Sequence, residues 1–338
     1  MRHKVRDVRH PAVSRAEAEE DRESGRQLRA HSRHRTQDRR SLRLRRAAVS
    51  ADDRRSLPGQ TLTEGAGSCS TGATGLDTTS NHEAASLLQF SSAGISIAYE
   101  VHGEGKPILL IHGFGSSGKV NWIDTGWVET LVEAGYQPIT FDNRGHGASR
   151  KLYDAQLYFA HEMARDAKRL LDHLGIVRAP IMGYSMGARI AAYLMLQDPG
   201  AVSCAVWGGM GLNLISGLED SEEIISALTA ESLDQVTGRT GRQFRIFADH
   251  NKADRAALAA CMVNSREPMR EADVRRITQP VLVAVGSDDD MAGSADGLAA
   301  LLPQGEAFTI ERRDHMRATG DKQFKAAALE FLARHAAE

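Results

Sequence analysis

A serine near the middle of the chain has the surroundings of a nucleophile. It stands in Gly183-Tyr184-Ser185-Met186-Gly187, between an apolar run typical of a strand and a stretch with helical periodicity. A sharp turn is needed to project the serine, and glycines two residues before and after it remove the Cβ atoms that would crowd that turn. The alternative is a serine that only caps a helix, which predicts no acid and no histidine downstream. Both follow downstream, so the pattern favours nucleophilic catalysis.

The elements that must hold this serine alternate along residues 86–338. Strands are predicted over the apolar runs Ile108–Ile111, Ile139–Phe141, Pro180–Gly183, Ala201–Trp207, Val281–Val285 and Ala307–Ile310. Helical periodicity covers Trp127–Ala134, His161–Leu174, Met186–Gln197, Ser294–Leu302 and Lys322–Ala336, and Leu88–Val101 alternates as an antiparallel hairpin would. This alternation predicts an α/β fold, a mostly parallel twisted sheet with helices on both faces. Such a sheet binds ligands at the carboxyl ends of its strands.

One interval between predicted strands is too long for a simple connection. Residues 211–276 contain amphipathic segments near Glu222–Thr229, Gln243–Phe247 and Arg255–Val263. A connection between parallel strands usually needs a single helix. We therefore predict that residues 86–338 form one α/β domain, into which about 211–276 are inserted as a small helical cap over the active site.

Three motifs, in this order along the chain, resemble those of the α/β-hydrolase family. The first is HGFG (residues 112–115), which resembles the family's oxyanion loop. The second is DNRGHGAS (residues 142–149), which resembles its D-x-R-G-x-G-x-S turn, and the third is the serine motif. The resemblance covers about residues 92–336. It implies the family's fold, in the branch with a serine nucleophile and a helical cap, and an esterase-like activity that requires no cofactor and no metal.

The resemblance also implies which residues complete the catalytic triad. In this fold an acid and then a histidine follow the serine along the chain. The family's acid lies three residues after the glycine that ends a late strand, which selects Asp289 over its two neighbours. The histidine is His315, on the loop between the last predicted strand and the last helix. His335, the other histidine downstream of Asp289, lies in the last helical turn, where a surface residue is expected.

The oxyanion hole follows from the same turn geometry. One backbone N–H comes from Met186, the residue after the nucleophile, and the other comes from Phe114. The side chain of Phe114 would then face the acyl pocket. His112 and His146 precede the nucleophile, and we assign both to bracing the loops, as we assign Arg144 to the structure of its turn.

Four residues beside these loops in the sequence are candidates for substrate binding. They are Trp122, Met210, Met291 and Met316, and Trp127 lies near the first of them. Apolar and aromatic side chains commonly form the walls of small-molecule sites. The alternative for all of them is ordinary packing in the core or the cap.

The serine nucleophile narrows the chemistry. Haloalkane dehalogenases and epoxide hydrolases of this fold carry Asp at that position. We predict hydrolysis of a carboxylic ester, with a lactone or a thioester as alternatives, through an acyl-enzyme. A carbon–carbon bond hydrolase or a cofactor-free perhydrolase would use the same triad, although the former commonly has Trp where Met316 follows the histidine. An alternative of another class is a ligand-binding receptor, which retention of all three triad residues disfavours.

Composition divides the chain into two parts. Residues 1–55 carry 17 Lys and Arg against 9 Asp and Glu, whereas the remainder carries 25 against 35. Residues 1–85 show no periodic apolar face, so we predict a basic, disordered N-terminal extension. Binding to nucleic acid or to an anionic membrane, and a transit peptide, are alternatives that the acidic residues at 17–21 weaken. Upstream sequence read from an early start codon is a further one.

The remaining features predict the cellular setting. No apolar run reaches the 18 residues of a membrane span, and no signal peptide is apparent. The three cysteines give no disulfide framework or metal-ligand spacing. We therefore expect a cytoplasmic protein that acts on a small ester-like molecule, with no nucleic-acid partner.

Overall fold

The structure confirms the predicted α/β fold. The computed structural model describes residues 86–217 and 220–336, so the disorder predicted for residues 1–85 concerns residues outside this range. Within the described residues, eight strands form one sheet in the order β1-β2-β4-β3-β5-β6-β7-β8. The strands are β1 (Leu88–Ser92), β2 (Ile95–Val101), β3 (Lys106–Ile111), β4 (Tyr136–Phe141), β5 (Ala179–Tyr184), β6 (Val202–Gly208), β7 (Val281–Gly286) and β8 (Gly305–Ile310).

The strand pairing brings the predicted motifs together. β1 and β2 form the expected antiparallel hairpin, β2 pairs antiparallel with β4, and the other pairs are parallel. Ile111 of β3 is in register with Gly183 of β5, which is in register with Trp207 of β6. Since parallel strands end at the same edge of a sheet, the HGFG loop after β3 lies beside the serine turn after β5.

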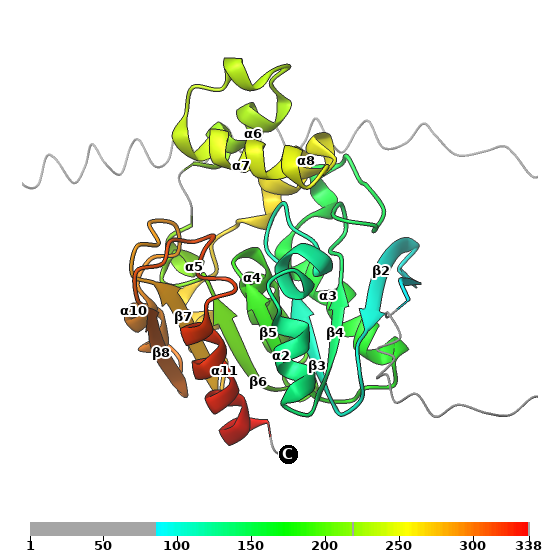
Figure 1. Cartoon of the computed structure of the whole chain (residues 1–338), viewed down its shortest axis with the longest axis vertical. Helices are drawn as coiled ribbons and strands as arrows, with labels where there is room; N and C mark the ends of the chain where they lie inside the picture. The colour runs from blue at the N-terminus through cyan, green and yellow to red at the C-terminus, as the bar shows by residue number, and fades with distance from the viewer. Residues whose placement is uncertain (1–85, 218–219, 337–338) are drawn as a thin grey trace, which may run out of the picture. The chain divides into compact units, whose positions relative to one another are not determined.

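Helices cover both faces of the sheet (Figure 1). α3 (Ala160–His173), α4 (Met186–Gln197) and α10 (Ala295–Ala299) pack on one face, and α2 (Trp127–Glu133) and α11 (Lys322–His335) pack on the other. The strands alternate accordingly, because Leu109 and Ile111 belong to the first core cluster and Ile108 and Leu110 to the second. Burial on both faces explains why these strands appear as continuous apolar runs in the sequence.

Several predicted bounds differ from those of the structure. β4 begins at Tyr136, three residues before the predicted start, and so includes Pro138. Proline has no N–H to give to a neighbouring strand, but the Pro138 carbonyl still accepts a hydrogen bond of 2.9 Å from the His102 N–H. α7 (Arg239–His250) is longer than the predicted segment, and α10 is shorter.

The segment between β6 and β7 is helical. It contains α5 (Asn213–Ser216), α6 (Ser221–Thr229), α7, α8 (Arg255–Ser265) and α9 (Glu271–Val274). α6 packs against α7 and α8, and Figure 1 shows these three helices beyond one end of the sheet. Arg189 of α4 holds both ends of the segment, since its guanidinium donates to the carbonyls of Asn213 (3.1 Å), Leu214 (3.0 Å) and Glu267 (2.8 Å). The helix that follows the serine therefore anchors this segment.

Other predicted features can be compared with the described residues. No helix among them has the length and apolar content needed to cross a membrane. In the same part of the chain, no group of three or more His, Cys, Asp or Glu side chains is arranged to hold a metal ion. Cys204 and Cys261 are buried, and burial raises the pKa of the first to about 11 and of the second to about 12. Both therefore remain thiols at neutral pH and pack as small apolar side chains.

Candidate active site

The turn from β5 into α4 holds Ser185 in a backbone conformation that few residues adopt. Its φ is 54° and its ψ is −114°, a region that costs a residue with a side chain on the order of 1–3 kcal/mol. A Cβ atom on Gly183 would lie 2.4 Å from the Gly187 carbonyl oxygen, and one on Gly187 would lie 1.9 Å from that of Ile111. The turn therefore requires glycine at both positions. The Ser185 N–H donates to the Gly208 carbonyl at 2.8 Å and ties the turn to β6.

The predicted acid, base and nucleophile lie in a hydrogen-bonded row. His315 Nε2 is 3.0 Å from Ser185 Oγ, and His315 Nδ1 is 2.8 Å from Asp289 Oδ2. The other carboxylate oxygen accepts the N–H groups of Met291 (2.9 Å) and Ala292 (3.0 Å). The Asp289 side chain is fully buried and that of His315 is 10% exposed. A carboxylate held in this way can fix the orientation of the imidazole.

The neighbours of Asp289 occupy different surroundings. Asp288 and Asp290 are exposed, and the Asp288 carboxylate accepts a hydrogen bond from the Ser287 hydroxyl. The three carboxylates follow β7 on one short loop, yet Asp289 is the one within hydrogen-bond distance of His315.

Tyr184 is not among the site residues predicted from the sequence, but it contacts the backbone of the predicted base. Its buried hydroxyl donates to the His315 carbonyl oxygen at 2.5 Å, and burial raises the pKa of this hydroxyl. The two rings lie 5.6 Å apart. Tyr184 ends β5 directly before the nucleophile, so the same strand positions both the serine and the backbone of the histidine.

The HGFG loop is braced from both sides. The Asn143 N–H donates to His112 Nε2 at 2.9 Å, so that His112 Nδ1 carries the proton and donates to the Gly113 carbonyl at 2.7 Å. Asn121 Oδ1 accepts the Gly113 N–H at 2.9 Å. Phe114 follows directly and is 5% exposed. The loop that would supply an oxyanion-hole N–H is thus fixed before any substrate binds.

His112 and His146 are buried neutral side chains. Burial lowers the pKa of His112 to about 4, and burial together with the neighbouring His112 lowers that of His146 to about 3. Their rings lie 5.2 Å apart, and the His146 ring meets the Phe114 ring edge-on at 5.8 Å. These contacts agree with the bracing role expected from the sequence.

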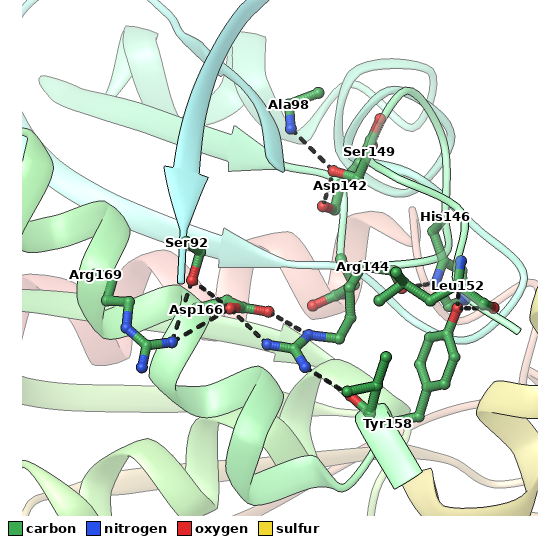
Figure 2. A network of polar contacts seen from close by, with 12 residues as sticks. Ser92, Ala98, Asp142, Arg144, His146, Ser149, Leu152, Tyr158, Asp166 and Arg169 are labelled. Carbon is green, nitrogen blue, oxygen red and sulfur yellow. Dashed lines mark hydrogen bonds and ion pairs between the residues drawn. The ribbon is translucent and has the colours of Figure 1, made fainter. Parts of the chain in front are cut away.

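The turn at residues 142–149 is held by the polar network of Figure 2. Arg144 donates to both carboxylate oxygens of Asp166 on α3, at 2.6 Å and 2.8 Å, and to the Leu157 carbonyl at 2.6 Å. The Ser92 hydroxyl also bonds to Asp166 and accepts from Arg169 at 3.2 Å. All three guanidinium nitrogens of Arg144 are therefore engaged by Asp166 and the Leu157 carbonyl, which agrees with its assigned structural role.

Two adjoining cavities lie beside Ser185 and His315. The small cavity, about 110 Å³, is bordered by Ser185, His315 and the HGFG loop. The large cavity has a volume of about 440 Å³, which is typical of small-molecule sites. It is bordered by His315 but not by Ser185 or the HGFG loop. Four residues, Phe244, Phe247, His315 and Met316, border both cavities.

The structure brings some of the predicted substrate-binding residues to these cavities. Met316 borders both, Met291 borders the large one, and Phe114 borders the small one. Trp122 is instead fully buried in a core cluster, where its ring meets that of Trp127 edge-on at 6.2 Å, and Met210 lies buried in the other cluster. Phe244 and Phe247, which sequence reasoning missed, lie on α7 inside the predicted cap.

Comparison with known proteins identifies the family. The family model described as alpha/beta hydrolase fold matches residues 106–208. A putative non-heme chloroperoxidase of Synechocystis sp. is 39% identical over 245 residues, which cover 64% of this chain and 85% of that protein. The chain belongs to the α/β-hydrolase fold family. A crystal structure of a bromoperoxidase from Bacillus anthracis agrees, with a TM-score of 0.61 and 25% identity over 74% of this chain and all of the other.

Other relatives match over a shorter length. The putative non-heme bromoperoxidase BpoC of Mycobacterium tuberculosis is 40% identical over 112 residues, 33% of this chain and 41% of BpoC. The putative carbamate hydrolase RutD of Variovorax paradoxus is 36% identical over 110 residues, 32% of this chain and 40% of RutD. The chain thus matches about two fifths of the length of each. These relatives are named as enzymes of different reactions, so membership of the α/β-hydrolase superfamily does not by itself set the reaction of this chain.

Proposed function

We propose that the chain is a serine hydrolase that cleaves carboxylic esters through an acyl-enzyme. The observation that carries the proposal is the row of contacts from Asp289 through His315 to Ser185 on a strained turn. A hydrogen bond from Nδ1–H to the carboxylate leaves Nε2 as the unprotonated nitrogen, facing the hydroxyl. This is the tautomer that a general base needs.

The reaction then proceeds in two stages. His315 Nε2 takes the hydroxyl proton as Ser185 Oγ bonds to the ester carbon, and the carbonyl oxygen becomes an oxyanion. The N–H groups of Phe114 and Met186 would bind that oxyanion, each contributing about 3 kcal/mol to the transition state. The imidazolium returns its proton to the departing alcohol oxygen and leaves the acyl group on the serine. Water attacks with the same base, releases the acid and restores the hydroxyl.

We further propose that residues 211–276 serve this site as a cap. Phe244 and Phe247 of α7 border both cavities, and Asn251 Nδ2 donates to the Gly115 carbonyl of the HGFG loop at 3.2 Å. The inserted helices therefore contribute walls to the site and contact the loop that would bind the oxyanion. Specificity for the acyl and alcohol groups would come from this segment, since the triad sets only the reaction type.

The nucleophile can be tested directly. A fluorophosphonate probe should label Ser185 in the wild-type protein and leave Ser185→Ala unlabelled, and the variant should lose p-nitrophenyl ester hydrolysis while keeping its circular dichroism spectrum. A folded Ser185→Ala protein that retains most of its kcat would overturn the proposal. A wild-type protein that is neither labelled nor active would indicate the ligand-binding receptor instead.

The names of several relatives favour perhydrolysis as a second candidate, because they are called non-heme haloperoxidases. In this reaction hydrogen peroxide, rather than water, attacks the acyl-enzyme, which gives a peracid and the free serine hydroxyl. Incubation with an ester and hydrogen peroxide distinguishes the two. Peracid formation that Ser185→Ala abolishes supports perhydrolysis, whereas release of the acid alone selects hydrolysis.

A further inference from the structure

The two cavities beside Ser185 and His315 differ in size. The small cavity, about 110 Å³, has a quarter of the volume of the large one, about 440 Å³. The small cavity combines apolar and polar side chains. The apolar ones are Phe114, Val120, Phe244, Phe247 and Met316, and four hydroxyl or amide side chains besides Ser185 and Tyr184 also line it, namely Ser116, Asn121, Thr125 and Thr319. The large cavity has a wall of Phe244, Ile246, Phe247, Met291 and Met316, with charged side chains that are mostly exposed around it.

The reaction geometry assigns one half of an ester to each cavity. The departing alcohol oxygen must receive its proton from His315 Nε2, whereas the carbonyl oxygen must reach the N–H of Phe114. His315 borders both cavities, but Ser185 and Phe114 border only the small one. The group carried by the alcohol oxygen therefore extends into the large cavity, and the acyl group extends into the small one.

A buried donor beside the small cavity has no hydrogen-bond partner within the described residues. Asn121 is 5% exposed, and its Oδ1 is identified as oxygen because it accepts the Gly113 N–H. Its Nδ2 has no hydrogen-bond partner within the described residues. The nearby Thr125 hydroxyl already donates to the Asn121 carbonyl at 2.7 Å, and the Thr319 side chain bonds to Tyr184.

The position of Asn121 is close to the reacting serine. A Cβ built on Gly113 would lie 3.5 Å from both Asn121 Oδ1 and Ser185 Cβ, so the amide and the serine flank the same glycine. A buried amide donor is nearly always hydrogen-bonded in proteins. A polar atom on a bound acyl group would supply the acceptor that Nδ2 needs.

We infer that the substrate is an ester of a short acyl group bearing a hydrogen-bond acceptor, such as a hydroxyl or alkoxy oxygen, with a larger apolar alcohol. Asn121 is the residue that selects the polar acyl group, through a hydrogen bond from Nδ2. The inference rests on the proposed ester hydrolysis and adds which half of the ester each cavity binds.

A pair of isomeric esters tests the assignment of the cavities. Hexyl acetate and ethyl hexanoate have the same atoms, but the six-carbon chain is on the alcohol in one and on the acyl group in the other. With hydrolysis followed in a pH-stat, the wild-type kcat/KM should be at least about tenfold higher for hexyl acetate, because a hexanoyl chain overfills the small cavity. An equal or higher kcat/KM for ethyl hexanoate would overturn the assignment.

A second pair tests Asn121. Hexyl glycolate and hexyl propionate differ by a hydroxyl in place of a methyl group, and the ratio of their kcat/KM values, compared between variants, cancels their intrinsic reactivities. Asn121→Leu keeps the side-chain size but removes the donor, so the glycolate-to-propionate ratio should fall about three- to tenfold. Any disturbance of Gly113 affects both esters alike. Thr125→Val is the matched control, because its hydroxyl is already engaged, and it should keep the wild-type ratio.

The outcomes separate this inference from the proposed function. An unchanged ratio in Asn121→Leu, or an equal fall in Thr125→Val, overturns the role of Asn121. If Asn121→Leu does not fold, the wild-type preference for glycolate, corrected by the alkaline hydrolysis rates, decides the matter, and its absence overturns the role. If a fluorophosphonate labels Ser185 but neither hexyl ester is cleaved, the inference fails and the nucleophile stands. If Ser185 is not labelled either, both fail.

Discussion

Asp289 and Asp166 are both shielded from solvent, but Asp166 is paired with a guanidinium and Asp289 with an imidazole. Their side chains are 0% and 1% exposed. Asp166 accepts two hydrogen bonds from the Arg144 guanidinium and one from Ser92 (Figure 2). Asp289 accepts two backbone N–H groups on one oxygen and the His315 ring on the other.

The partner determines what each carboxylate can do. A guanidinium stays protonated at every accessible pH and has no lone pair, so the Arg144–Asp166 pair can only hold two segments together. An imidazole can accept and release a proton, and the second nitrogen of His315 faces Ser185 beside two cavities. Burial of a charged pair is therefore weak evidence for a catalytic role, whereas a titratable partner with a free nitrogen facing a nucleophile is strong evidence.

The largest effect on the rate is expected from a change to the Asp289–His315 pair. Asp289→Asn should lower kcat by about 10⁴-fold with little change in the circular dichroism spectrum, because the amide favours the wrong tautomer of His315. Steady-state kinetics with p-nitrophenyl acetate would measure it.

The neighbouring carboxylates provide the control for this change. Asp288→Asn and Asp290→Asn remove exposed charges from the same loop and should each change kcat by less than about threefold. If either of them has the largest effect, the acid is misassigned while the hydrolase proposal stands. If none of the three matters, the triad itself fails.

A change to the Arg144–Asp166 pair should affect the stability of the protein rather than its rate of catalysis. Arg144→Met leaves the buried Asp166 with only the half-exposed Arg169, 3.7 Å away, as its counter-charge, and should lower the free energy of unfolding by about 3 kcal/mol. Urea unfolding measures this, and kcat per folded molecule should stay near the wild-type value. The double variant Arg144→Met/Asp166→Leu should recover part of the loss, since no buried charge remains unpaired. A large fall in kcat without a loss of stability would place the turn in the active site.

Much of the fold follows from local patterns, and the row from Asp289 to Ser185 follows from them together with the resemblance to the α/β-hydrolase family. Strands buried on both faces leave apolar runs, and parallel strands bring the loops after β3, β5 and β7 to one edge. Gly183 and Gly187 cannot be replaced, because a Cβ atom on either would lie less than 3 Å from a backbone oxygen. Their spacing around Ser185 is therefore visible in the sequence. The start of β4 is not visible in the sequence, because Gln137 and Pro138 separate Tyr136 from the apolar run that begins at Ile139.

The pocket walls and the polar partners depend on packing that no local pattern contains. Asn121 and Trp122 are consecutive, and adjacent residues on a helical turn point in different directions. Asn121 therefore borders the small cavity, whereas Trp122 packs in the core. Trp122 is close to the HGFG loop in the sequence, but this closeness does not place its side chain in the cavity. Asp166 lies 22 residues from Arg144, and only the docking of α3 brings the two together.

A smaller effect is expected from the buried histidines, which unlike His315 face no nucleophile. His112 has a pKa of about 4 and His146 of about 3 in the folded protein, against about 6.5 when unfolded. Below pH 6.5 the unfolded chain therefore binds more protons, and stability falls as the pH is lowered toward those values. Each histidine contributes up to about 1.4 kcal/mol per pH unit.

Urea unfolding at pH 7, 6 and 5 measures this slope. His146→Gln should make the slope shallower, because a glutamine does not titrate. A free energy of unfolding that is as pH-dependent in this variant as in the wild type would show that other groups are responsible.

The smallest effect should come from an ion pair that is exposed, on the same helix that carries Asp166. The Lys168 ammonium contacts Asp172 one turn further along α3, with 26% and 57% of their side chains exposed. Water already solvates both charges, so Lys168→Ala should cost no more than about 0.5 kcal/mol, and raising the salt concentration should remove most of that difference. Urea unfolding with and without 0.5 M NaCl measures both quantities. The added salt should hardly alter the loss of stability in Arg144→Met, because the Asp166 carboxylate is buried and dissolved ions cannot approach it. If Lys168→Ala lowers the free energy of unfolding by more than about 2 kcal/mol, exposure does not explain why the Lys168–Asp172 and Arg144–Asp166 pairs differ. The position of α3 itself would then determine how much stability is lost.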